Sequence, residues 1–270
     1  MKISKLANLP QKKIIVFDLD GTLTPTKAAM DDEMTGLVRR LLAAKKVAVI
    51  GGGKYGLFRM QLLKPLRGSA GLFGNLFLFP TTATSFYIYQ SGWKNVYALA
   101  LSKREKDKIK KAFRDAFQKA GYQHPKKVYG KVIEDRGTQI TFSALGQEVV
   151  AVLGKKRGVA LKEQWLHKNR AVKMKIARIL GSMLPEFEVR AAGFTSIDVT
   201  KKGIDKAYGL RQIAKHLRTG IGDMLFIGDA IFPGGNDYAI VKTGVDYISV
   251  SGHEETKRIL RTLLECAERV

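Results

Sequence analysis

The stretch FDLDGTLT, residues 17–24, follows the apolar run IIV and puts Asp18 and Asp20 two residues apart at the end of an expected strand. Residues i and i+2 of an extended strand point to the same side, so the two carboxylates would share a site. Asp229 ends a later apolar run, MLFIGD, in the same manner. Three carboxylates at one sheet edge would repel one another unless a cation such as Mg²⁺ lies among them. For DLDG alone, a turn or helix cap is an equal alternative, because Asp-Gly is a common turn signal.

The expected elements on both sides of this stretch alternate between strand and helix. Strands at KKIIVFDLD, VAVIGGG and NLFLFP are separated by a helix over residues 31–44 and by a second helix that ends near Pro65. Near the C-terminus the alternation resumes with IDKAYGLRQIAKHL, MLFIGD, YISV and EETKRILRTLLECAERV. This order predicts an α/β fold, a Rossmann-like doubly wound parallel sheet covered by helices. Ligands of such sheets bind beyond the carboxyl ends of the strands.

The middle of the chain has a different pattern. Ser102 and Glu105 form a capping-box signature at the start of a basic helix that ends near Ala120. Strand-like segments VIEDRG and TQITFSA, a helix over residues 163–184, and the strands FEVRAAG and SIDVTKK follow. We therefore expect an inserted α+β cap domain over residues 88–192 and a catalytic core formed by residues 1–87 and 193–270.

Composition limits the class of protein. The 270 residues contain one cysteine and four scattered histidines, which excludes a disulfide framework and a cysteine-rich zinc site. No apolar run is long enough to span a membrane, and MKISKLANLPQKK has no long apolar region before Pro10. We therefore expect a cytoplasmic protein without a leader segment or a membrane partner.

The formal net charge of +23 is unusual. Between Glu33 and Glu105 there is no acidic residue, so this segment should have a positive potential suited to phosphorylated small molecules. The chain lacks a zinc-finger pattern, an aromatic RNA-binding signature and a basic low-complexity tail. We do not expect nucleic acid to be the partner; a nucleic-acid binder that uses the positive charge is kept as an alternative class.

The segment GGGKYG, residues 51–56, matches the glycine pattern of dinucleotide-binding sites. That pattern also needs an acidic residue about twenty positions later, and none occurs from Met34 to Arg104. Nicotinamide and flavin binding are therefore excluded. Gly52 and Gly53 fit better as a backbone site for phosphate, with a ligand-free tight turn as the alternative.

In this order, the four segments resemble the motifs of the haloacid dehalogenase superfamily of phosphotransferases. The D-x-D-G-T motif is matched by residues 18–22, the second strand end by VAVIGGG, the motif lysine by Lys206 or, as second choice, Lys202, and the last motif by GD and ND at residues 228–229 and 236–237. Within the large-cap IIB branch, FDLDGTLTPTK, SIDVTKKGIDKAYGL and FIGDAIFPGGNDY look most like the eukaryotic-type phosphomannomutases. The resemblance covers nearly the whole chain.

The resemblance implies a mechanism and a set of site residues. Asp18 would attack phosphorus to form an aspartyl-phosphate, Asp20 would act as acid and base, and Lys206 would hold the phosphate. Mg²⁺ is the implied cofactor, with ligands from Asp18, Asp20 through its carbonyl, Asp229, Asn236 and Asp237. The implied phosphate and sugar contacts are Thr22, Gly52, Gly53, Arg136, Ser196 and Asp198. Mutases of this type dimerise through the cap, so a homodimer stays open.

Departures from the mutase pattern affect the expected reaction. Positions aligned with further cap arginines hold Tyr129 and Gln147, and Gly51, Gly52 and Gly53 offer no hydroxyl group. A mutase must grip a bisphosphate while it reorients, and arginines are among the strongest phosphate ligands. We therefore expect a Mg²⁺-dependent phosphatase that hydrolyses a small phosphorylated metabolite, in particular a sugar phosphate. Phosphomannomutase activity is the alternative.

Overall fold

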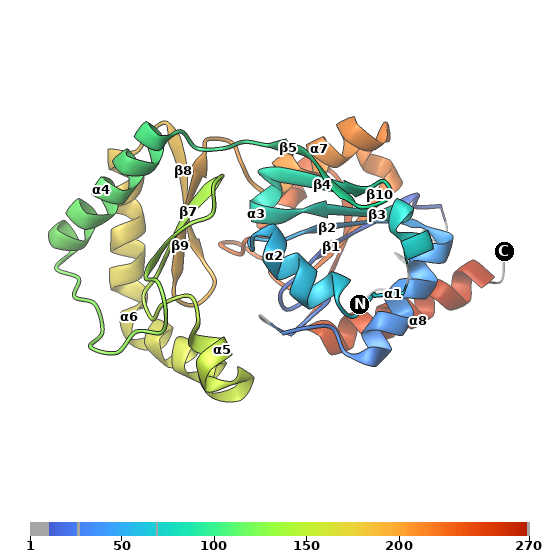
Figure 1. Ribbon diagram of the computed structural model, residues 1–270, viewed down its shortest axis with the longest axis horizontal. Helices are drawn as coiled ribbons and strands as arrows, with labels where there is room; N and C mark the ends of the chain where they lie inside the picture. Colours follow the sequence, from blue (N-terminus) through green and yellow to red (C-terminus); the bar gives the residue numbers. More distant parts are fainter. Residues whose placement is uncertain (1–10, 26–27, 69, 269–270) are drawn as a thin grey trace. The chain divides into compact units, whose positions relative to one another are not determined.

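The computed structural model describes residues 11–25, 28–68 and 70–268 (Figure 1). The chain forms two compact units, here called the core unit (Met1–Ala98 and Asp205–Val270) and the cap unit (Leu99–Ile204). Residues 1–10, on which the expectation of no leader segment rests, lie outside the described residues. Among the described residues, no helix combines the length and the apolar character that crossing a membrane requires.

The core unit contains a seven-stranded sheet in the order β11-β10-β1-β2-β3-β4-β5. Its parallel strands are β1 (Ile14–Asp18), β2 (Lys46–Ile50), β3 (Leu76–Phe79), β10 (Met224–Gly228) and β11 (Asp246–Ser249). The hairpin of β4 (Ser85–Tyr89) and β5 (Trp93–Ala98) extends it with antiparallel pairing. The predicted Rossmann-like parallel sheet is confirmed, and β1 and β10, the strands that lead into Asp18 and Asp229, are direct neighbours.

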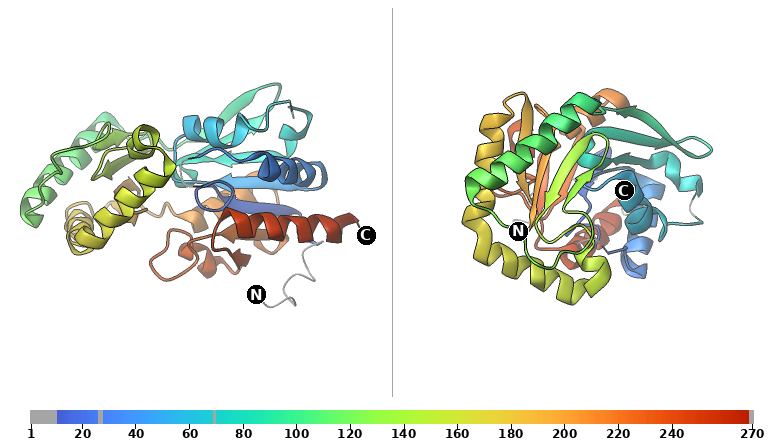
Figure 2. Two further views of the ribbon diagram at one scale, coloured as in Figure 1. Left: turned by 90° about the horizontal axis from the view of Figure 1, so that it is seen from below. Right: turned by 60° about the vertical axis from the view of Figure 1, so that its left-hand side comes forward.

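Alternate residues of the core strands face two different layers. Ile15 and Phe17 of β1 belong to the apolar cluster on the side of α1 and α8, whereas Ile14 and Val16 belong to the cluster on the side of α7. The helices of these layers are α1 (Asp32–Ala44), α8 (His253–Glu268) and α7 (Lys206–Leu217), and Figure 2 shows α8 lying along one side of the sheet. Burial on both faces explains why these strands read as uninterrupted apolar runs.

Short helical segments fill the connections of the core unit. They are α2 (Tyr55–Phe58), the π-helical turn η2 (Arg59–Leu63), the 3₁₀ turns η3 (Ala70–Asn75), η4 (Ile221–Asp223) and η5 (Tyr238–Thr243), and α3 (Pro80–Ala83). The predicted helix that ends near Pro65 is thus one α-helical turn continued by a π-helical turn. In α3, three consecutive residues adopt left-handed φ angles of 50°, 56° and 63°, which strains L-residues and is costly for the two threonines.

The cap unit contains an antiparallel sheet in the order β6-β7-β9-β8. Its strands are β6 (Ile133–Asp135), β7 (Gln139–Ser143), β9 (Ser196–Lys201) and β8 (Phe187–Ala192), and its helices are α4 (Lys103–Ala120), α5 (Val149–Leu153) and α6 (Lys155–Met183). Ile140, Phe142, Ile197 and Val199 pack in one apolar cluster with residues of α4 and α6, which lie side by side (Figure 1). Both predicted hydrogen bonds of the capping box at Ser102 are present.

The boundaries of the cap unit lie later in the chain than the expected 88 and 192. Strand β5 pairs with β4 and so belongs to the core sheet, although its residues fall after position 88. Strand β9 pairs with both β7 and β8 and so belongs to the cap sheet, although its residues fall after position 192. The boundaries are set by which strands pair through hydrogen bonds. The composition of the sequence did not indicate this pairing.

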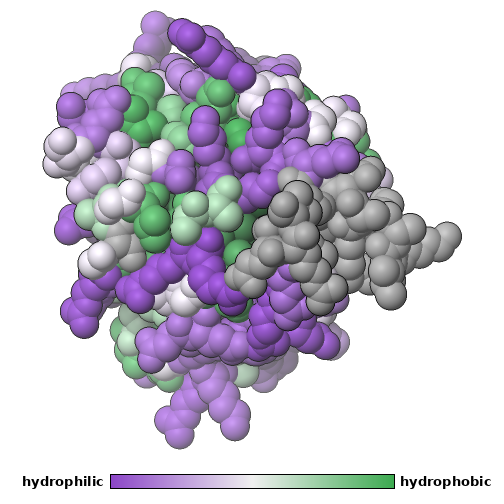
Figure 3. Space-filling model, turned by 90° about the vertical axis from the view of Figure 1, so that its right-hand side faces the viewer, coloured by the Kyte–Doolittle hydropathy of each residue, from purple (hydrophilic) through white to green (hydrophobic). Residues whose placement is uncertain are grey.

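The surface of the core unit shown in Figure 3 is covered mainly by hydrophilic residues, with only small hydrophobic groups between them. Such a distribution is ordinary for a protein surface in contact with water. The described residues drawn in colour on this face therefore form no extended apolar area that would point to a partner.

Candidate active site

Three carboxylates converge at the carboxyl edge of the core sheet. Asp18 is the last residue of β1, Asp229 directly follows β10, and Asp237 comes from the loop before η5. One carboxylate oxygen from each of these residues lies within 4.8 Å of the other two. The parallel pairing of β1 with β10 brings Asp18 and Asp229 together across more than two hundred residues of sequence.

Lys206 is the cation inside this group. It is the first residue of α7, only 2% exposed, and its Nζ lies 2.5 Å from Asp18 Oδ1 and in an ion pair with Asp237. Burial would lower the pKa of Lys206, but the charges of Asp18 and Asp237 outweigh burial and raise it. The other candidate lysine, Lys202, is exposed and donates to the carbonyl of Pro185 in the cap unit. Lys206, the first choice for the motif lysine, is therefore the candidate that contacts the carboxylates.

The negative charge at this site exceeds what one lysine neutralises. Burial, opposed by Lys206, and then the charges of Asp237 and Asp229 raise the pKa of Asp18 well above its usual range. Burial and Asp237 likewise raise the pKa of Asp229. A further cation stabilises the ionised form of carboxylates that are buried close together. Three oxygen donors suit a hard divalent ion such as Mg²⁺. The donor set of Asp18, Asp229 and Asp237 therefore fits the implied metal.

Gly21 allows the backbone to approach this group. Its φ is +92°, and a Cβ built on it would lie 2.3 Å from Asp229 Oδ2, so any side chain would displace that carboxylate. The neighbouring Thr22 is buried, and its Oγ1 donates to Asp229 Oδ1 at 3.4 Å. The Asp-Gly-Thr sequence thus serves the site by close packing as well as by turning the chain.

The carboxylates of the D-x-D pair have different neighbours. Asp20 Oδ1 accepts a hydrogen bond of 2.9 Å from Gln61 Nε2, and Asp20 is not in the group of three converging carboxylates. The expected metal ligand Asn236 is exposed at the surface. Of the five ligand residues expected, the structure thus brings together the carboxylates of Asp18, Asp229 and Asp237, while the Asp20 carboxylate bonds to Gln61.

The glycine loop after β2 is fixed mainly through its carbonyl groups. Those of Gly51 and Gly53 each accept a 2.9 Å hydrogen bond, from the N–H groups of Thr82 and Thr81. Gly51 N–H donates to Phe79 at 3.3 Å. The left-handed turn of α3 therefore holds this loop, while binding of phosphate by the N–H groups of Gly52 and Gly53 stays a prediction.

The cap unit has a polar row on the face of its sheet opposite the apolar cluster. Strand register pairs Glu134 with Thr141, Thr141 with Asp198, and Asp198 with Arg190, so that one residue from each strand lies in the row. Thr141 Oγ1 donates to Asp198 Oδ1 at 2.7 Å. Burial raises the pKa of Asp198, and the charge of Arg136 opposes this shift most strongly. Two expected sugar-phosphate residues, Asp198 and Arg136, therefore interact.

Arg136 is engaged by two neighbours. Its Nε lies 2.8 Å from Glu134 Oε2, and its Nη2 donates to Gln147 Oε1 at 3.2 Å. Ser196 begins β9, two residues before Asp198, and is partly buried. Gln147, which aligns with a cap arginine of the mutases, thus contacts the arginine that is retained. The cap has the expected residues in one region, with the guanidinium partly neutralised by Glu134.

Comparison with known proteins agrees with this geometry. Residues 120–266, more than half of the chain, match the family described as eukaryotic phosphomannomutase. The chain belongs to this family. Phosphomannomutase of Encephalitozoon cuniculi (strain GB-M1) is 28% identical over 258 residues, 92% of each chain, and phosphomannomutase of Spinacia oleracea is 28% identical over 230 residues, 84% of this chain and 85% of the other.

Solved structures identify the wider fold class of this phosphomannomutase-family chain. N-terminally truncated, IMP-bound IMP-nucleotidase of Plasmodium falciparum superimposes with a TM-score of 0.68 at 15% identity, over 97% of this chain and 71% of the other. Trehalose-6-phosphate phosphatase of Aspergillus fumigatus superimposes with a TM-score of 0.55 at 16% identity, over 98% of both chains. The fold is that of the haloacid dehalogenase superfamily, and the predicted resemblance is confirmed.

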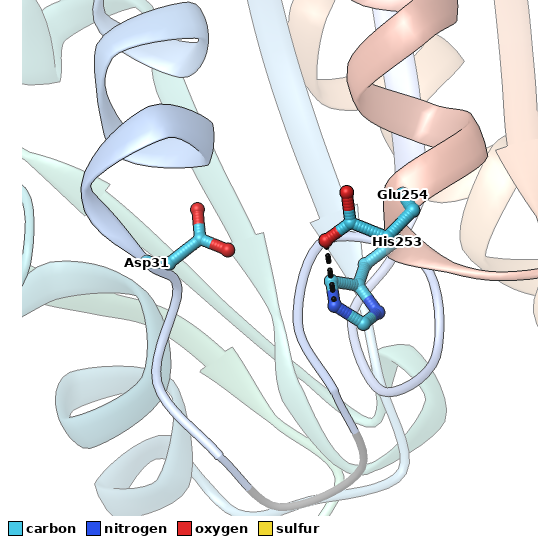
Figure 4. A group of neighbouring side chains, drawn as sticks. All are labelled: Asp31, His253 and Glu254. Atoms are coloured by element: carbon cyan, nitrogen blue, oxygen red, sulfur yellow. Dashed lines mark ion pairs between the residues drawn. The ribbon is translucent and has the colours of Figure 1, made fainter.

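A second group of metal-ligand types lies elsewhere in the core unit. Asp31 precedes α1, and His253 and Glu254 begin α8 (Figure 4). Lys257 Nζ already lies 2.7 Å from Asp31 Oδ2 and 2.8 Å from Glu254 Oε1. Asp31 also caps α1 by accepting from Met34 N–H at 2.9 Å. This group is a surface ion-pair network that joins two helices, and Lys257 already neutralises part of its negative charge.

Sequence reasoning missed Gln61. It is 1% exposed, and besides Asp20 its Nε2 donates to the carbonyl of Ala28 at 3.1 Å. The available signal was a lone amide inside the apolar segment LFRMQLLKPL. A buried amide needs partners, and here one of them is the expected acid/base residue of the phosphomannomutase pattern.

Proposed function

We propose that the protein is a Mg²⁺-dependent, cytoplasmic hexose phosphate mutase of the phosphomannomutase type, with Asp18 as the phosphorylated nucleophile. The main support is the buried contact of Lys206 with both Asp18 and Asp237, at the edge of the sheet where Asp229 also lies. The sequence alone led us to put hydrolysis ahead of the mutase. Family membership favours the opposite order, because the curated relatives that match nearly the whole chain are phosphomannomutases.

In the proposed reaction, Asp18 attacks the phosphorus of a hexose bisphosphate, and the P–O bond to the sugar oxygen breaks. Asp20, oriented by Gln61, gives a proton to that oxygen and later takes one from the hydroxyl that is phosphorylated. Lys206 neutralises charge on the transferring oxygens while Asp237 keeps its ammonium in position. When bound by Asp18, Asp229 and Asp237, Mg²⁺ supplies the positive charge that lets an anionic nucleophile approach an anionic phosphate.

The cap residues would recognise the part of the substrate that is not reacting. Arg136 is suited to a phosphate group and Asp198 to sugar hydroxyl groups. A mutase needs this second grip, since the bisphosphate must turn around without leaving. We include in the proposal that the cap unit sets substrate specificity. Dimerisation through the cap stays a prediction.

Hydrolysis is the second candidate function, and one observation favours it. Arg136 is already paired with Glu134 and bonded to Gln147, so the guanidinium has less to offer a second phosphate than an unengaged arginine would. A weak second grip would release the bisphosphate and let water complete the cycle. The two candidates share Asp18 and differ in which molecule accepts its phosphoryl group.

The product of mannose 1-phosphate distinguishes the candidates. The protein is incubated with mannose 1-phosphate, Mg²⁺ and a catalytic amount of hexose 1,6-bisphosphate, and the products are followed by ³¹P NMR. We expect mannose 6-phosphate to accumulate without inorganic phosphate. Inorganic phosphate in an amount equal to the substrate consumed would establish the phosphatase instead. No turnover by either route across a panel of hexose phosphates would refute the proposed function.

A further inference from the structure

The turn between β8 and β9 of the cap unit leads directly into Ser196 and Asp198. One buried lysine of α6 lies against this turn. Lys173 is 4% exposed, and its Nζ donates to the carbonyls of Ala192 at 3.1 Å, Gly193 at 2.6 Å and Phe194 at 3.4 Å. An ammonium group has three N–H donors, so these three consecutive carbonyls match its whole capacity.

The rest of the turn is held from the other side. The carbonyl of Thr195 accepts from Ala144 N–H at 3.0 Å, and Thr195 Oγ1 lies 3.2 Å from Ser143 Oγ. Gly193 has a left-handed φ of +44°, which bends the chain so that neighbouring carbonyls can point toward one donor. Lys173 thus fixes the first half of a turn whose second half is tied to the β7 end. Without it, these three partly buried carbonyls would lose the donor that Lys173 supplies.

The charged groups around Lys173 connect it to the polar row. Burial lowers the pKa of Lys173 to about 8, and the carboxylate of Asp198 on β9 opposes that shift. The charges of Arg136, of Arg190 on β8 and of Lys173 all act on Asp198 in turn. Lys173 therefore interacts with the expected sugar-binding carboxylate through its charge, while its hydrogen bonds hold the turn that precedes it.

We propose that Lys173 is a positioning residue for the substrate: its ammonium group fixes the turn at residues 192–194 and thereby holds Ser196 and Asp198 in their binding geometry. This inference rests on the proposed function, in which these two residues contact the sugar phosphate. A small displacement of binding groups by a distant change can reduce activity by a large factor. Loss of the ammonium group should therefore raise KM more than it lowers kcat.

The alternative is that Lys173 merely stabilises the cap unit. Lys175 provides a matched control on the same helix, because its Nζ also donates to a backbone carbonyl, that of Ala120 at 3.4 Å, at the end of α4 and far in sequence from the turn. A purely structural lysine would affect melting temperature and leave the split between KM and kcat unchanged. Comparison of Lys173→Met, Lys173→Arg and Lys175→Met in the full chain separates these roles.

The experiment has two readouts. The first is KM and kcat for mannose 1-phosphate from pH 6.5 to 9. We expect Lys173→Met to raise KM about tenfold with kcat changed less than about threefold, and Lys175→Met to change neither. Wild-type KM should rise as pH passes about 8, because Lys173 then loses its charge and one of three donors. Lys173→Arg should remove that rise, since a guanidinium stays protonated.

The second readout is amide hydrogen exchange, which does not need turnover. In Lys173→Met, exchange should become faster in peptides that cover residues 190–198 and stay unchanged in α4. Unchanged KM, or faster exchange spread through the whole cap unit as in a generally destabilised variant, would overturn the inference. If the wild-type protein turns over no hexose phosphate, the proposed function fails; the positioning role then stands or falls on whether exchange changes locally at the turn.

Discussion

The core unit and the cap unit balance their charged groups differently. In the core, three carboxylates lie around the buried ammonium of Lys206, so negative charge is in excess. In the cap, the charges of Arg136, Arg190 and Lys173 act on the partly buried Asp198, but a glutamate lies within ion-pair distance of each arginine, so the opposite charges match. A group with excess negative charge is completed by a metal cation, whereas a group whose charges match is neutral without one. In the proposed function, the core group would transfer the phosphoryl group and the cap group would recognise the sugar phosphate.

The comparison is tested most strongly at Asp18. Replacement of Asp18 by Asn removes the nucleophile and keeps the shape of the side chain. We expect phosphoryl transfer to fall by at least about 10³-fold with the fold intact, because the step has no substitute nucleophile. Activity is measured with mannose 1-phosphate and with an aryl phosphate, and circular dichroism checks folding. Retained activity in a folded variant would exclude Asp18 as the nucleophile.

Lys206→Met tests whether the core group depends on its ammonium. Breaking a buried ion pair leaves uncompensated charge, so the free energy of unfolding should fall by about 3–5 kcal/mol at neutral pH. The loss should be smaller at acid pH, where Asp18 can bind a proton. Urea unfolding at both pH values measures this. Lys202→Met is the control, and an exposed lysine should cost no more than about 0.5 kcal/mol. Equal losses in both variants would contradict the arrangement.

Mg²⁺ should stabilise the protein through the three carboxylates. Burial raises the pKa of Asp18 and of Asp229, so without a cation their contribution to stability falls as pH rises above the usual carboxyl pKa near 4. A bound divalent ion stabilises the ionised carboxylates and so opposes this loss of stability. The stabilisation by Mg²⁺ should therefore grow as pH rises. At about one hundred times Kd, we expect about 2.7 kcal/mol of stabilisation.

The Mg²⁺ effect is measured as the shift of the unfolding midpoint with and without the ion. Asp229→Asn should abolish most of it. Asp31→Asn, in the surface network of Figure 4, keeps a side-chain oxygen that can cap α1 but removes the ion pair with Lys257, so it should lower overall stability slightly and leave the Mg²⁺ increment unchanged. If Asp31→Asn removes the Mg²⁺-dependent shift and Asp229→Asn does not, Mg²⁺ binds at the surface network. That outcome would contradict the proposed chemistry, which needs the metal at Asp18, Asp229 and Asp237.

The smallest expected effect concerns the cap arginine. Glu134 and Arg136 are 17% and 12% exposed, so their ion pair is largely shielded from water. Glu134→Gln should make Arg136 more available to phosphate and lower KM for a hexose phosphate by about three- to tenfold. It should also reduce the share of inorganic phosphate among the products. Exposed Glu148 is the control, and Glu148→Gln should leave KM unchanged. A higher KM for Glu134→Gln would mean that Glu134 orients Arg136 for binding.

The sequence was sufficient for the parallel core, because β1, β2 and β10 are uninterrupted apolar runs that end in polar residues. It also indicated that Asp18 and Asp229 would meet. The boundaries of the cap could not be predicted, since they depend on which strand pairs with which, a long-range property. The partners of Asp20 and Arg136 were also missed. Gln61 lies 41 positions from Asp20, and periodicity gives no information about such contacts.

The polar row of the cap limits how the cap sheet can misfold. Along β9, Ile197 and Val199 face the apolar cluster, while Asp198 between them faces the row. A slip of one residue in pairing would turn every side chain to the opposite face, so it would bury charged groups and expose aliphatic ones at once. Misregistered cap sheets are therefore heavily penalised, and a cap that has folded at all has Asp198 on the face of the polar row.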